Sequence, residues 1–137
     1  MPAYIDTGLN LVDVRDVAEG HCLAFERGRP GEKYILGNRN MTLSEIFGTL
    51  ARISGLPAPR IRLPYRPVLA LARFAYAVSL LTKREPFIPY DGVRMAKKYM
   101  FFSSAKAVAE LGLPQTPVET ALADAVEWFY NNGYVKK

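Results

Sequence analysis

Hydrophobic and polar positions change their spacing several times along this chain, and each change predicts a new element. Residues 8–14 are apolar and follow a turn glycine, which predicts a strand. Apolar positions then recur at helical spacing as far as Gly28, and Asp13 or Asp16 is expected to begin this helix. Its predicted buried face consists of Val14, Val17, Ala18, His21, Cys22 and Phe25. A second short strand is predicted over residues 33–36.

The middle of the chain predicts a helix, an edge strand and a second, more apolar helix. The segment Thr42–Glu45 is a capping box, with a hydroxyl at the cap and a carboxylate three residues later, and its helix ends near Gly55. Residues 60–64 predict an edge strand, because Pro64 removes a ladder donor. The helix that follows Pro67 is apolar around nearly its whole circumference. We expect it to be a core helix, and the alternatives are a lid over an apolar substrate or a membrane-surface helix.

The last third predicts short elements between breaks. Pro86 and Pro89 interrupt the chain, a short helix is expected over residues 93–98 and a strand over 99–102. Ser103 is expected to cap a helix over residues 105–111. The segment Thr116–Glu119 resembles a second capping box and begins the final helix, which packs Val118, Leu122, Val126 and Phe129.

This succession of elements predicts an α/β to α+β fold that is mostly helical with a few short strands. The 137 residues, half of them hydrophobic and 23% charged, suit one globular domain. The strand content is too small for a self-sufficient parallel sheet, so we expect the chain to be part of a larger unit. One cysteine excludes an internal disulfide, and a cytoplasmic location is the default expectation.

Charge is distributed unevenly. Residues 60–106 contain ten Lys and Arg against Glu85 and Asp91, a net +8 within a chain of +5. Such a region suits an anionic membrane, a phosphorylated small molecule or nucleic acid, and the alternative is a solvated basic surface. The sequence contains no nucleic-acid-binding signature, so we expect no nucleic acid partner.

The usual catalytic motifs are missing from the sequence. It contains no G-x-G-x-x-G turn for a dinucleotide and no tyrosine followed four residues later by lysine. Tyr90 has Arg94 at that spacing, and we interpret this pair as structural. His21 and Cys22 are neighbours on a helix and therefore diverge, so we interpret the first as a satisfied helix residue and the second as core filler. No metal site is predicted.

Four segments in register resemble extended short-chain dehydrogenases/reductases, a family of NAD-dependent epimerases, dehydratases and reductases. They are Asn10–His21, Gly31–Asn38 with the following Thr42–Glu45, Ser103–Gly112, and Trp128–Phe129. Within the family the chain is most similar to dihydroflavonol-reductase-like members and hopanoid-associated sugar epimerases.

The resemblance implies that this chain is the carboxy-terminal, substrate-binding half of an enzyme that uses NAD or NADP. The glycine-rich cofactor loop and the catalytic Tyr-Lys pair belong to the amino-terminal Rossmann half, so the chain is expected neither to bind cofactor nor to be catalytic by itself. Residues 1–40 would join the missing half and 41–137 would bind substrate, within one domain, 1–137. Met1 and Pro2 then correspond to an internal position. The Arg-rich segment of nucleotide-sugar epimerases is replaced by the apolar helix, which favours an apolar or lipid-linked substrate.

Four residues are candidates for substrate contact. Asn10, Asp13 and Asn38 lie at predicted strand ends, where such folds bind ligands, and Arg94 suits an anionic group. Asp16 is expected to hold the first helical turn. Loss of the Rossmann half would leave open strand edges, so self-association is expected. The alternative function is a stand-alone basic and apolar module that binds an anionic membrane surface or a protein partner.

Overall fold

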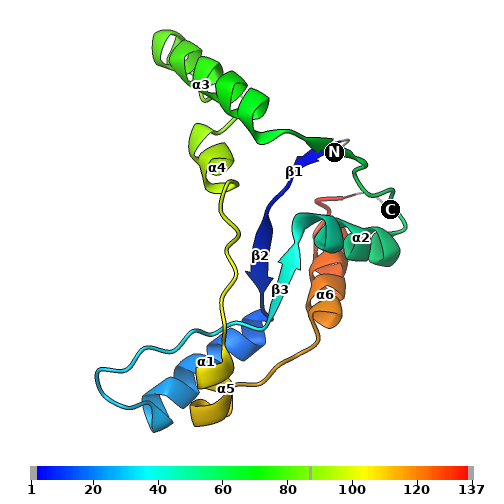
Figure 1. Ribbon diagram of the computed structural model, residues 1–137. Coiled ribbons are helices and arrows are strands. Elements are labelled where there is room, and N and C mark those ends of the chain that lie inside the picture. Colours follow the sequence, from blue (N-terminus) through cyan, green and yellow to red (C-terminus); the bar gives the residue numbers. More distant parts are fainter. Residues whose placement is uncertain (1–2, 87, 136–137) are drawn as a thin grey trace.

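The computed structural model describes residues 3–86 and 88–135; Met1 and Pro2, predicted to be an internal position, lie outside them. The elements in chain order are β1 Ala3–Ile5, β2 Gly8–Leu11, α1 Val14–Arg27, β3 Arg39–Thr42, α2 Leu43–Ser54, β4 Ile61–Leu63, α3 Tyr65–Thr82, α4 Tyr90–Met95, α5 Ala105–Leu111 and α6 Val118–Asn131. Short strands lie at the centre, with α3 and α4 at one end and α1 and α5 at the other (Figure 1). The predicted mixed α/β class is confirmed.

The strands form two separate pairs. β1 and β4 are parallel, with Tyr4 opposite Arg62, and β2 and β3 are antiparallel, with Leu9 opposite Met41. The predicted edge strand is therefore confirmed as β4. Two-stranded pairs are marginal by themselves, so the strands depend on the helices packed around them.

Two small cores hold the helices in place. One joins α1 to α5 and consists of Leu23, Ala107, Leu111 and Leu113. The other joins β3, α2 and α6 and consists of Met41, Ile46 and Val118. The capping box predicted for α2 is present, since Thr42 and Glu45 exchange hydrogen bonds with each other's backbone, and Gly55 ends the helix in the left-handed conformation.

Two predicted strands are not strands in the structure. Residues 33–36 run as irregular chain beside α5, where the Tyr34 hydroxyl donates to Glu110 and Leu36 packs against the first core. Residues 99–102 make a single bridge, between Met100 and Leu9. Within the described residues, 33–36 pair with no strand. Residues 99–102 lie beside β2, where the Met100 nitrogen donates to the Gly8 carbonyl, but the side chains of Asn10 and Asn40 bind the Phe102 backbone in place of further ladder bonds.

Two predicted helix caps are also wrong. Ser104, not Ser103, occupies the cap of α5. Pro117 occupies the cap of α6, because the hydroxyl of Thr116 donates to Asp16 instead of bonding to its own helix. The Thr116 hydroxyl therefore binds a carboxylate distant in sequence instead of accepting from a backbone N–H of α6, which sequence spacing cannot reveal.

The predicted buried face of α1 is exposed. Its buried residues are Asp16, Gly20 and Leu23, whereas Val14 and Phe25 are 78% and 92% exposed. Cys22, predicted as core filler, is exposed, and so is His21, whose ring nitrogen contacts the carbonyl of Val17. The helix turns Asp16, Gly20 and Leu23 toward the rest of the chain and leaves the predicted apolar side open.

The apolar helix α3 is not a core helix either. It packs chiefly against α4 and extends from the end of the molecule (Figure 1). Ala72 is its one buried residue, while Phe74 and Leu81 are 68% and 86% exposed. None of the helices in the described ranges has the length and apolar character needed to cross a bilayer.

Candidate functional site

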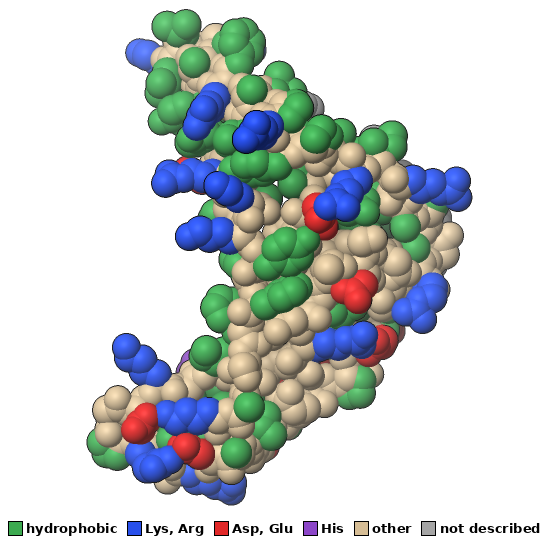
Figure 2. All heavy atoms as spheres, in the orientation of Figure 1, with side chains coloured by type: hydrophobic (Ala, Val, Ile, Leu, Met, Phe, Trp, Pro, Cys, Tyr) green, Lys and Arg blue, Asp and Glu red, His purple; other side chains and the backbone are tan. Residues whose placement is uncertain are grey.

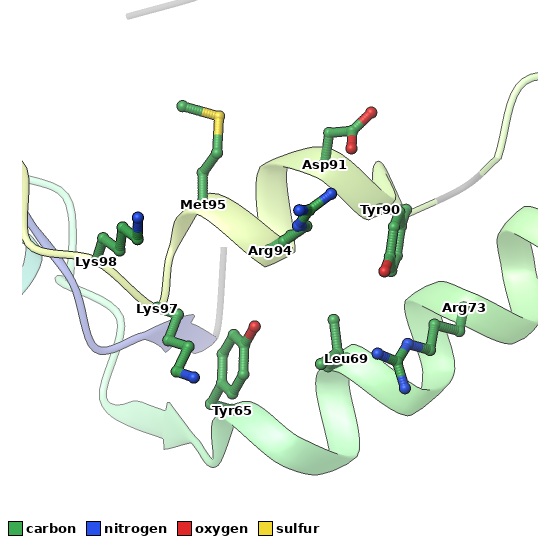
Figure 3. A pocket seen from close by; sticks show the side chains of 9 residues that line it. All are labelled: Tyr65, Leu69, Arg73, Tyr90, Asp91, Arg94, Met95, Lys97 and Lys98. Atoms are coloured by element: carbon green, nitrogen blue, oxygen red, sulfur yellow. The ribbon is translucent and has the colours of Figure 1, made fainter.

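A cleft of about 660 Å³ opens between α3 and α4. Its lining consists of Tyr65, Leu69, Arg73, Tyr90, Asp91, Arg94, Met95, Lys97 and Lys98. Figure 3 shows Tyr65 and Leu69 projecting from α3 toward α4, and Tyr90 pointing back toward α3. Asp91 points away from α3 in the same view. The cleft therefore combines aromatic and apolar walls with basic side chains.

Helical spacing explains why these side chains meet. Tyr65, Leu69 and Arg73 follow one another at intervals of four residues, which places them on one face of α3. Tyr90 and Arg94 have the same spacing on α4, whose start is set by Pro89. The rings of Tyr76 and Tyr90 lie 5.8 Å apart and join the two helices beside the cleft.

Four basic side chains and one acidic side chain line this cleft. The cations are Arg73, Arg94, Lys97 and Lys98, and the acid is Asp91. Across residues 3–86 and 88–135, no ion pair involves these four cations. Unpaired cations beside an apolar wall provide hydrogen-bond donors for an anionic group. Arg94 is the one predicted site residue in this cleft.

Asn10 and Asn38 lie together, at a distance from the cleft in sequence and fold. The side-chain oxygen of Asn10 accepts from the backbone nitrogen of Asn38 at 3.1 Å, and the side-chain nitrogen of Asn10 donates to the side-chain oxygen of Asn40 at 2.7 Å. The Asn38 side chain donates to the Thr116 carbonyl at 2.6 Å. These bonds join the strands to distant segments, so both asparagines are already used internally. Their contact with substrate stays a prediction.

Asn40 is a residue that sequence reasoning missed. Its side-chain oxygen accepts from the backbone nitrogen of Phe102 at 3.1 Å, and its nitrogen donates to the carbonyl of Phe102 at 3.0 Å. One amide side chain thus provides both bonds that a neighbouring strand would provide. Asparagine before a capping box carries no distinctive sequence signal for this role.

Asp13 holds the start of α1. Its carboxylate accepts from the backbone nitrogen of Arg15 at 2.8 Å and from the Arg15 guanidinium at 2.9 and 2.7 Å. These bonds, first the one from the guanidinium, lower the pKa of Asp13 from 3.8 to about 2. Arg15 also contacts Asp124 at 2.5 Å, which ties α1 to α6. Of the two aspartates predicted to begin this helix, Asp13 is the cap and Asp16 lies in the first turn; contact of Asp13 with substrate stays a prediction.

Asp16 has a role beyond its own helical turn. Its buried carboxylate accepts from the backbone nitrogen and the hydroxyl of Thr116, each at 2.7 Å. It therefore fixes the connection between α5 and α6 across 100 residues of sequence. No group of His, Cys, Asp or Glu in the part of the chain that the structure describes is arranged to hold a metal ion.

The fold defines the class. The chain matches the carboxy-terminal half of extended short-chain dehydrogenase/reductase and epimerase structures over 99% of its own length, which confirms the predicted resemblance. One of these is the nucleoside-diphosphate-sugar epimerase PA4631 from Pseudomonas aeruginosa, 31% identical with a TM-score of 0.72, of which the chain covers 40%. No family model matches the chain.

Two curated proteins are similar in sequence. The putative dihydroflavonol 4-reductase of Synechocystis is 50% identical over an alignment of 140 positions that covers 99% of this chain and 41% of that protein. Sterol demethylase protein B of Methylococcus capsulatus is 30% identical over 98% of this chain and 42% of that protein. The chain thus spans about two fifths of the length of the curated relatives that it matches, and corresponds to their carboxy-terminal part.

Proposed function

We propose that this chain is the substrate-binding part of an NAD(P)-dependent epimerase or reductase and performs no hydride transfer by itself. The observation that carries the proposal is the α3–α4 cleft, in which Arg73, Arg94, Lys97 and Lys98 surround apolar and aromatic side chains. This chemistry suits a substrate with an anionic group attached to a less polar body. The relatives named above are a putative reductase, an epimerase and a sterol demethylase protein, and this range of names supports a class rather than one compound.

The chain's residues do not fit the dinucleotide. A pyrophosphate site needs a glycine-rich turn between a strand and a helix, and the turn from β2 into α1 is Val12–Asp13, with a carboxylate at the helix start. A carboxylate there repels a pyrophosphate and already accepts from the backbone nitrogen of Arg15. NAD or NADP is therefore proposed to be held by another part of the protein, and this part binds and orients substrate.

The exposed face of α1 supports a second half of the enzyme as a partner. Val14 and Phe25 are the most exposed large apolar side chains of that helix. Exposed apolar area of this kind is costly in an isolated globular protein and is ordinarily covered. The chain corresponds to only about two fifths of the length of each curated relative. The partner proposed to cover the exposed face of α1 is therefore the cofactor-binding part of the same enzyme.

A chimaera tests the proposed function. The amino-terminal part of the Synechocystis relative, up to the matched region, is joined to this chain. Turnover is followed as NAD(P)H oxidation with a dihydroflavonol, and as conversion to the epimer with UDP-sugar probes, since epimerisation consumes no NAD(P)H. We expect turnover from the chimaera with one probe class and none from the 137-residue chain. Turnover by the isolated chain, or a folded chimaera that binds NAD(P)H but accepts no probe, would contradict the proposal.

The role of the cleft is tested in the same chimaera. Arg94→Gln is expected to raise KM for an anionic probe at least about tenfold, because it removes a charge-assisted hydrogen bond. The matched control is Arg52→Gln on α2, an exposed arginine that does not line the cleft. Equal KM values for the two variants would exclude the cleft as the anion site.

A further inference from the structure

The outer side of α3 carries a continuous apolar surface. We define the α3 apolar stripe as Leu71, Phe74, Val78 and Leu81, all of which are exposed. Their spacing of three, four and three residues places them on one side of the helix. Ala72, the buried residue of α3, lies on the side toward α4, so the stripe faces away from the rest of the chain.

The surroundings of the stripe are basic. Helix α3 contains Arg66 and Arg73 and no acidic residue, and Lys83 and Arg84 follow its last turn. Both arginines on the helix lie on one margin of the stripe, at the side of the cleft. Figure 2 shows the hydrophobic side chains gathered at the α3 end of the molecule, with Lys and Arg side chains beside and below them.

The apolar stripe and the cations at its margin together indicate which kind of surface covers the stripe. An apolar helix face with cations along its margin matches an anionic bilayer, whose phosphates meet the cations while acyl chains take up the apolar side chains. A partner seated on the exposed face of α1 does not account for the stripe, because α1 and α3 lie at opposite ends of the molecule (Figure 1).

We propose that the α3 apolar stripe lies on the surface of an anionic lipid bilayer, with Phe74 and Leu81 inserted among the acyl chains. Both side chains are mostly exposed, at 68% for Phe74 and 86% for Leu81. The long stems of Arg66 and Arg73 allow their charged groups to reach the headgroup layer. The inference shares Arg73 with the cleft of the proposed function, but bilayer binding requires neither cofactor nor substrate, so flotation tests it separately.

Vesicle flotation of the complete 137-residue chain tests this proposal, since aggregated protein stays at the bottom of the gradient. We expect the chain to float with phosphatidylcholine vesicles that contain phosphatidylglycerol, and to do so less with pure phosphatidylcholine or at high salt. The variant Phe74→Ser with Leu81→Ser should lower the partition coefficient by about a hundredfold, because each buried side chain contributes about tenfold. The matched control, Val14→Ser with Phe25→Ser on α1, should float like the parent chain.

A second measurement localises the contact. In a Trp128→Phe background, Phe74→Trp should show a blue shift of its emission on addition of the anionic vesicles, whereas Phe25→Trp should not. The proposal is overturned if the parent chain does not float, or if the stripe variant floats equally well. A second copy of the chain would be the occupant of the stripe if the parent chain self-associates without floating and the stripe variant no longer self-associates; this result also overturns the proposal.

Discussion

At the scale of single residues, Asp13 shows how a capping side chain becomes a pH-dependent contribution to stability. Its pKa is about 2 in the folded chain, because the Arg15 guanidinium and backbone both donate to it. A lowered folded-state pKa stabilises the protein above the unfolded pKa near 3.8, and this stabilisation is lost as the pH falls toward 2.

We therefore expect Asp13→Asn to lower the free energy of unfolding at neutral pH and to have less effect in acid. Denaturant unfolding of both proteins from about pH 6 to about pH 3 measures this difference, which should shrink through the range in which the unfolded carboxyl becomes protonated. A difference that is constant across this range would show that ionisation of Asp13 contributes nothing.

Asp16 and Thr116 give a second prediction at this scale. Asp16→Ala leaves the Thr116 nitrogen and hydroxyl without their acceptor, so the free energy of unfolding should fall by about 1–3 kcal/mol. Thr116→Val should cost less in the Asp16→Ala background than in the parent chain, because one interaction cannot be lost twice. Strict additivity of the two substitutions in denaturant unfolding would refute a direct interaction.

At the scale of elements, helix ends follow local sequence while helix faces do not. The capping box of α2 satisfies backbone groups within four residues, so sequence spacing was sufficient to predict it. Thr42→Ala should lower the free energy of unfolding by about 1 kcal/mol. Thr120→Ala, an exposed threonine within α6, is the matched control and should change it by less than about 0.5 kcal/mol. Equal effects of the two substitutions would count against the cap.

The two ends of the molecule should respond differently to truncation of leucine. Leu111, at the end of α5, is completely buried in the core that joins α5 to α1, so Leu111→Ala should lower the free energy of unfolding by about 2–5 kcal/mol. Leu81→Ala, on the outer side of α3, should stay within about 0.5 kcal/mol of the parent chain. A large loss for Leu81→Ala would mean that the end of α3 is covered in solution.

At the scale of the whole molecule, the small cores leave the chain dependent on partners. The sequence predicted self-association through open strand edges; in the structure we expect the exposed face of α1, with Val14 and Phe25, to cause self-association of the isolated chain. Light scattering during gel filtration should give a mass above that of a monomer, and Val14→Ser with Phe25→Ser should reduce it. A monomeric parent chain across the accessible concentration range would disprove this expectation.

Sequence by itself determined the elements that depend on neighbours within a few residues. The starts of α1 and α2, the edge strand β4 and the family resemblance were all correct, because caps, proline positions and motif order are local properties. The strands expected at 33–36 and 99–102 were wrong, because a ladder requires a partner strand that spacing does not specify.

Only the tertiary structure decided which side of each helix is covered. Periodicity in α1 correctly marked an apolar side, yet that side is open and the polar Asp16 is buried against Thr116. In α3, apolar residues around the helix predicted a core position, and the structure places a cleft on one side and the α3 apolar stripe on the other. A hydrophobic pattern predicts that a helix face is covered, and the three-dimensional arrangement shows whether residues of the same chain cover that face.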